Sequence, residues 1–185
     1  MALDDSPVVA GFIGEYRRSK LLAEKAFAQV TDEQLCWKLS PAQNSLHVIA
    51  QHMSGNLRSR FTDFLTSDGE KANRNREGEF AEPAGPITRE QFLAMWESGW
   101  HVLFDALANL SDADLHRTVT IRTEPYTVAE ALVRSVAHCA YHVGQIMLLA
   151  KHLKGEGWTY VTVPPGGTAE YNRLVAAGEQ SQRVR

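Results

Sequence analysis

The run VRSVAHCAYHVGQIMLLAKH, residues 133–152, decides the fold class that the sequence predicts. Its apolar side chains recur at three- and four-residue intervals, which is typical of a helix with one buried face. We expect this helix to extend from Thr127 to Leu153. Two histidines, His138 and His142, lie one turn apart on it, so their imidazoles share a face and can converge on one metal ion.

Three earlier segments show the same helical periodicity. The first, residues 6–30, begins with a Ser-Pro pair, a good capping residue followed by a first-turn proline. The second covers residues 44–66. The third covers residues 88–110 and begins with Thr-Arg-Glu-Gln, which has the spacing of a capping box. With the histidine-bearing segment, the chain therefore contains four amphipathic helices.

The segments between these helices differ greatly in length and composition. Residues 67–87 are rich in glycine, proline, asparagine and charge, which predicts a long loop. Residues 118–123, TVTIRT, alternate like a short strand, and residues 168–177 predict a short helix. The sequence thus predicts an all-α fold in which residues 1–185 form a single domain: a four-helix bundle with a long crossover loop, a short strand segment before the last long helix and a short C-terminal helix.

Composition excludes several classes of protein. The formal net charge is −3, which disfavours a nucleic-acid-binding protein that neutralises phosphates. No apolar run approaches the length of a membrane span, and the N-terminus carries acids where a signal peptide has a basic region. The only two cysteines, Cys36 and Cys139, have no framework spacing, which fits a reducing compartment. We therefore expect a cytoplasmic protein without a nucleic-acid or membrane partner.

The second predicted helix offers two candidates for a third metal ligand. Five residues separate His47 from His52, so the two side chains point about 140° apart and only one can face the site. We prefer His52, because it shares a polar stripe with Asn56 and Asp63. Three histidines bind Zn²⁺ or Ni²⁺ and leave a coordination position open. From spacing alone, however, ordinary hydrogen-bonded histidines at the edge of the core are the commoner explanation.

Basic side chains cluster at the end of the second helix and in the long loop. The basic residues are Arg58, Arg60, Lys71, Arg74 and Arg76. They alternate with five acidic residues: Asp63, Asp68, Glu70, Glu77 and Glu79. Arginine presents a planar fork that suits carboxylates and phosphates, so the cluster could be an anion-binding rim near the metal. It is at least as consistent with ion pairs that hold the loop in place. Both interpretations can apply to different arginines.

The sequence resembles the DinB-like, or YfiT-like, superfamily of metal-dependent four-helix proteins. The resemblance rests on AQHMSGNLRSRFTDF around His52 and on AHCAYHVGQIMLLAK around His138 and His142. It extends to a branch of unknown function with a tail like VPPGGTAEYN, and so covers nearly the whole chain. The resemblance implies a metal site at His52, His138 and His142, nickel or zinc as the metal, and a homodimer. His47 does not match a ligand position of the superfamily.

The superfamily includes thiol-dependent transferases and isomerases that use bacillithiol or mycothiol. We therefore expect a metal-dependent S-transferase or related hydrolase acting on a small molecule, with a low-molecular-weight thiol as partner. The residues expected to bind or orient the substrate are Asn56, Arg58, Arg60, Asp63, Arg74 and Arg76. No side chain is singled out as catalytic. Two alternatives remain: a non-catalytic stress-response protein that binds a metal or small molecule, and a purely structural bundle.

Overall fold

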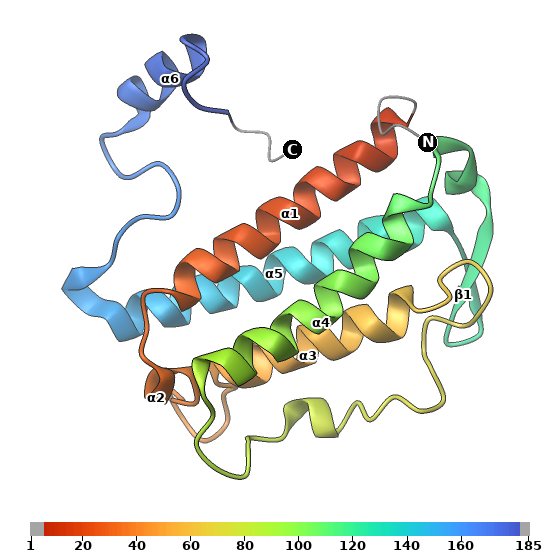
Figure 1. Cartoon of the computed structure of the whole chain (residues 1–185), viewed down its shortest axis with the longest axis horizontal. Coiled ribbons are helices and arrows are strands. Elements are labelled where there is room, and N and C mark those ends of the chain that lie inside the picture. The colour runs from red at the N-terminus through yellow and green to blue at the C-terminus, as the bar shows by residue number, and fades with distance from the viewer. Residues whose placement is uncertain (1–5, 182–185) are drawn as a thin grey trace.

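Four long helices dominate the computed structural model, which describes residues 6–181 (Figure 1). They are α1 (Pro7–Phe27), α3 (Leu46–Phe61), α4 (Arg89–Ala108) and α5 (Val128–Lys154). The shorter elements are α2 (Asp32–Leu35), α6 (Thr168–Ala176), the strands β1 (Thr118–Ile121) and β2 (Glu124–Thr127), and three 3₁₀ turns, η2 (Gly78–Phe80), η3 (Asp112–His116) and η4 (Gly155–Gly157). The predicted all-α bundle, with its short strand segment and C-terminal helix, is confirmed.

Side-chain caps fix where three of the long helices begin. Thr88 accepts a hydrogen bond from the backbone N–H of Gln91, whose side chain accepts one from the backbone of Thr88, so the predicted capping box is present at α4. Thr127 and Glu130 form the same arrangement at α5, and Ser45 caps α3. Each cap satisfies donors that the first helical turn leaves free, and this is why these starts were readable from the sequence.

The long helices pack as two pairs. Helix α1 lies against α5, and α3 lies against α4. Figure 1 shows that α3 and α4 run in the same direction, opposite to α1 and α5. A chain that leaves the end of α3 must therefore return along the whole helix, about 24 Å, before α4 can begin. Residues 62–88, which include η2, make this crossover.

The core lies between the two helix pairs and is rich in aromatic side chains. Trp96 and Trp100 of α4 and Tyr16 of α1 are fully buried, and their rings meet edge to face. Gly99 lies against α3, where an added Cβ would stand 2.6 Å from the Cα of Ser54. Only glycine allows the two helices to approach so closely at this point.

The strand segment is a hairpin, whereas the sequence predicted one strand over residues 118–123. Strands β1 and β2 pair antiparallel, with Ile121 opposite Glu124. The turn residues Arg122 and Thr123 have φ of 53° and 66°, values that hairpin turns usually assign to Asn or Gly. Asp68 of the crossover supports the turn, because its carboxylate accepts the backbone N–H groups of both turn residues.

Helix α3 ends at Phe61, five residues before the predicted end at residue 66. The chain leaves the helix at Thr62, whose ψ is 126°, and Asp63 follows in the left-handed region with a φ of 47°. Near the other terminus, α6 forms close to its predicted bounds and projects from the bundle with no buried residue (Figure 1). Within residues 6–181, none of the helices combines the length and apolar character needed to cross a bilayer.

Candidate metal centre

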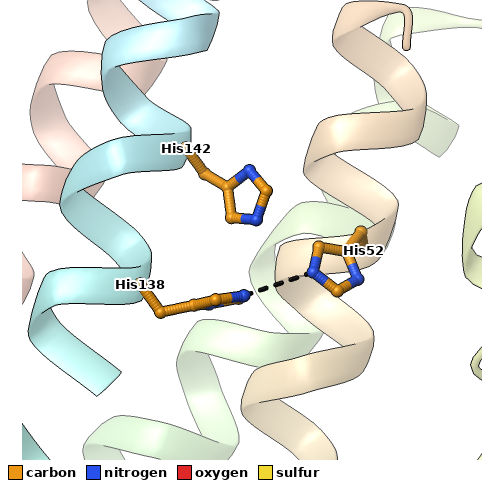
Figure 2. Close-up of side chains that lie close together, drawn as sticks. All are labelled: His52, His138 and His142. Carbon is orange, nitrogen blue, oxygen red and sulfur yellow. Dashed lines mark hydrogen bonds between the residues drawn. The ribbon is translucent and has the colours of Figure 1, made fainter. Parts of the chain in front are cut away.

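Three histidines from two helices converge between α3 and α5. His52 comes from α3, and His138 and His142 come from α5, one turn apart. Each ring offers one nitrogen, and these three atoms lie within 4.8 Å of one another. Figure 2 shows the rings pointing into the space between the helices, where the Nε2 atoms of His52 and His138 are 3.2 Å apart. The structure thus brings together the three residues that the sequence predicted.

Hydrogen bonds to the outer ring nitrogens set the tautomers of two of these histidines. His52 Nδ1 donates to Glu79 Oε2 at 2.9 Å, and His142 Nδ1 donates to Gln145 Oε1 at 2.8 Å. The Nδ1 protons therefore point away from the centre and the Nε2 atoms face it. The Nε2 atom of His142 is buried and has no hydrogen-bond partner. A cation bound between the three rings would satisfy this lone pair.

The surroundings keep the two histidines of α5 uncharged. Burial, together with the neighbouring imidazoles of the cluster, lowers the pKa of His138 to about 3. Burial likewise lowers the pKa of His142 to about 4, although its hydrogen bond to Gln145 opposes the shift. Both rings are therefore neutral near pH 7, the form that binds a metal. The donor set and its protonation fit a divalent transition metal.

A buried ion pair holds His52 in place. The carboxylate of Glu79 accepts from His52 and also from Arg74, whose Nε and Nη2 donate to its two oxygens at 2.7 Å each. The Arg74 side chain is only 4% exposed. Burial raises the pKa of Glu79, but the hydrogen bonds from His52 and Arg74 outweigh that effect, so the net shift is downward. The carboxylate is therefore charged when it orients the imidazole, an arrangement common behind metal-binding histidines.

Local sequence gives Glu79 the room to reach His52. Gly55 follows His52 by three residues on α3, and a Cβ at that position would stand 2.5 Å from Glu79 Oε1. A larger residue there would displace the carboxylate. Next to Glu79 in η2, the ring of Phe80 stacks on His52 with centroids 4.6 Å apart, and the guanidinium of Arg76 lies over the Phe80 ring. The crossover thus covers one side of the centre.

A cavity of about 180 Å³ opens beside the histidines, between α3, α5, the crossover and the hairpin. His52 and His138 line it, together with four of the predicted substrate-binding residues: Asn56, Arg60, Arg74 and Arg76. Arg58 and Asp63 do not line it. Arg58 is exposed and donates to Ser98 of α4, whereas Asp63 forms the turn after α3. The substrate-binding role of all six residues stays a prediction.

His47 does not join the cluster. It is buried on α3, with its ring centroid 6.2 Å from that of Phe92 on α4, and its Nδ1 has no hydrogen-bond partner. Burial lowers the pKa of His47, so this ring is also neutral near pH 7. The geometric preference for His52 over His47 therefore agrees with the arrangement in the structure.

Sequence reasoning missed several residues around the centre. Glu79 was noted only as one acid of a mixed cluster, and no spacing rule connects it to a histidine 27 positions away. Arg134 and Tyr141, which line the cavity, could have been found, because they share α5 with the histidine pair and Arg134 precedes His138 by one turn. Arg122 of the hairpin turn also lines the cavity, and no sequence signal pointed to it.

Comparison with known proteins places the chain in a family. A family model described as protein of unknown function (DUF1572) matches residues 7–167, which include every long helix and all three histidines. The chain belongs to the DUF1572 family. No curated protein matches it. The description of DUF1572 names no activity.

Proposed function

We propose that this DUF1572 protein is a metal-dependent enzyme whose divalent ion is held by His52, His138 and His142. One observation carries the proposal: three imidazoles converge within 4.8 Å, and one inward-facing nitrogen is buried without a hydrogen-bond partner. Three protein ligands are typical of catalytic zinc sites, whereas structural zinc sites usually have four. A coordination position therefore remains for a substrate or water, next to the cavity.

The reaction that we propose is thiol-dependent S-transfer or a related hydrolysis. The proposal draws on the resemblance to the DinB-like superfamily, with which the DUF1572 match and the helical bundle are consistent. From the same resemblance we propose nickel or zinc as the metal, a low-molecular-weight thiol as partner, and a homodimer. A cytoplasmic location fits the thiol chemistry and the unpaired cysteines.

The roles of the residues follow from the contacts around the centre. A divalent ion, when bound, would act as a Lewis acid and lower the pKa of a thiol or water that it coordinates. Glu79 and Gln145 hold the rings of His52 and His142 so that their Nε2 atoms face the centre. Phe80 covers His52 and excludes water from that side. Tyr141 and Asn56 line the cavity and can form hydrogen bonds to a substrate placed there.

Turnover by metal-loaded protein tests the proposal. Nickel- or zinc-loaded wild type would be incubated with low-molecular-weight thiols and alkylating acceptors, and separately with esters and amides. We expect loss of free thiol or release of a hydrolysis product. Metal-stripped protein and His142→Ala should show at least about a hundredfold less turnover. Wild type that holds metal but is no faster than His142→Ala in every assay would contradict the enzyme proposal.

A second candidate is a protein that binds a metal or small molecule without turnover. One observation favours it: among residues 6–181, those lining the cavity include no aspartate or glutamate that could act as a general base. This candidate predicts tight, specific ligand binding by metal-loaded protein together with unchanged ligand after long incubation. The turnover assay distinguishes the two functions.

A further inference from the structure

The cavity beside the histidines carries a surplus of positive charge. Among the described residues, no aspartate or glutamate lines the cavity. Its walls contain five arginines: Arg60, Arg74, Arg76, Arg122 and Arg134. They come from α3, the crossover, the hairpin turn and α5, so the tertiary fold, and no single basic run, gathers them. The whole chain has a formal net charge of −3, so the positive charge of the cavity is opposite in sign to the net charge of the protein.

Two of these arginines already interact with side chains of the crossover. Arg74 donates to both oxygens of Glu79 and to Glu70. Arg76 lies over the Phe80 ring and is 3.5 Å from the exposed Glu77 carboxylate. Both therefore position the crossover, as the loop-holding interpretation of the sequence predicted.

The other three arginines are incompletely neutralised. The side chains of Arg60 and Arg122 both contact Glu70 Oε2, which already accepts from Arg74 at 3.0 Å. It stands 3.3 Å from Arg60 and 3.4 Å from Arg122. The Arg60 atom in this ion pair is Nη1, which is buried and makes no hydrogen bond, so Glu70 compensates its charge only in part. The side chain of Arg134 makes no hydrogen bond or ion pair with any residue from 6 to 181.

The electrostatics of Arg60 agree with this shortage of negative charge. Its side chain is only 13% exposed. Burial lowers the pKa of its guanidinium, and three neighbouring guanidiniums lower it further against the opposing effect of one carboxylate. A buried guanidinium that shares one carboxylate oxygen with two other arginines is costly unless a further anion joins it.

We propose that Arg60, Arg122 and Arg134 bind an oxyanion group, a carboxylate or phosphate, of the substrate. Arg134 precedes His138 by one turn of α5, about 6 Å along the axis, and Arg60 follows His52 by two turns of α3, about 12 Å. The anion therefore lies on the hairpin side of the histidines. The cavity of about 180 Å³ has the volume of roughly six waters, so the part of the molecule that enters it is small.

This inference rests on the proposed function, since the anion belongs to the molecule that would react at the centre. Its test uses metal-free protein, so that binding does not depend on the histidines. Calorimetric titrations with inorganic phosphate and with succinate, at low ionic strength in a zwitterionic buffer, distinguish the two oxyanions. We expect saturable, one-site binding of at least one of them to wild type.

Charge-removing variants locate the binding site. Arg134→Gln should weaken binding at least about tenfold, because one charge-assisted contact is lost. This arginine is exposed and without a partner, so the variant should fold, which circular dichroism checks. Arg60→Gln should have a similar effect. Arg173→Gln, on the remote helix α6, removes the same charge and should leave the affinity within twofold of wild type.

Two outcomes would overturn the anion proposal. One is no saturable binding of either anion to correctly folded wild type. The other is equal weakening in Arg134→Gln and Arg173→Gln, which would mean that only overall charge matters. If anions bind as expected while no metal is retained, the enzyme proposal fails and the anion site stands. If metal is retained while neither anion binds, the anion proposal fails and the enzyme proposal stands.

Discussion

At the scale of single residues, the contact that most directly shapes the centre is the one between Glu79 and His52. The carboxylate fixes the tautomer of the imidazole and is itself fixed by Arg74. Gly55 leaves the space that this arrangement occupies. Three residues that do not face the metal position therefore determine how one ligand presents its lone pair.

Replacing Glu79 by glutamine should weaken metal binding by about 10- to 100-fold, because the charged acceptor behind His52 is lost. The affinity for zinc or nickel would be measured by competition with a chromogenic chelator. Glu77→Gln is a matched control, since Glu77 lies two residues earlier and its side chain is 90% exposed. Equal affinities of Glu79→Gln and Glu77→Gln would show that Glu79 does not support the ligand.

The histidines were predictable at this scale and their partner was not. His138 and His142 lie on one helix, where spacing alone fixes their relative direction. His52 could be chosen over His47 because the two point in different directions and only His52 shares a polar stripe. Glu79 reaches the centre from a crossover whose path depends on packing, and periodicity carries no information on such a path.

At the scale of elements, the crossover and the hairpin depend on each other. Asp68 accepts the backbone N–H groups of Glu70, Arg122 and Thr123. Gly69 also donates its N–H to the carbonyl of Thr120 in β1. The second strand was missed in the sequence because its turn is Arg-Thr, which lacks the Gly or Asn that marks a tight hairpin. The support comes from outside the hairpin, through one carboxylate.

Replacing Asp68 by asparagine should lower the free energy of unfolding by about 1 kcal/mol at pH 7, since the amide keeps only one acceptor oxygen. Hydrogen bonds from the backbone of Glu70 and Thr123 lower the pKa of Asp68 to about 2 from 3.8. A lowered folded-state pKa stabilises the protein above pH 4, and this contribution is lost as pH falls toward 2.

Urea unfolding at pH 7 and at pH 2 would test this contribution. The difference in stability between wild type and Asp68→Asn should shrink at the lower pH. Asp105→Asn is the control, because Asp105 lies on α4 and its side chain is 66% exposed. A difference that is absent at pH 7, or that persists unchanged at pH 2, would mean that the carboxylate does not hold the hairpin turn.

At the scale of the whole molecule, the candidate centre joins the two halves of the bundle. Helix α3 belongs to one packed pair and α5 to the other, and the histidines bridge them (Figures 1 and 2). The four helices and their starts followed from periodicity and caps. The gathering of arginines from four separate segments did not, because it is a product of how the crossover and hairpin fold against the helices.

Metal content per chain tests the central claim most directly. Protein purified without an affinity tag would be analysed for metals before and after reconstitution with nickel or zinc. We predict close to one ion per chain in wild type and in His47→Ala, and loss of that ion in His52→Ala and His138→Ala. Wild type without metal after reconstitution, or His47→Ala losing metal as fully as His52→Ala, would contradict the account.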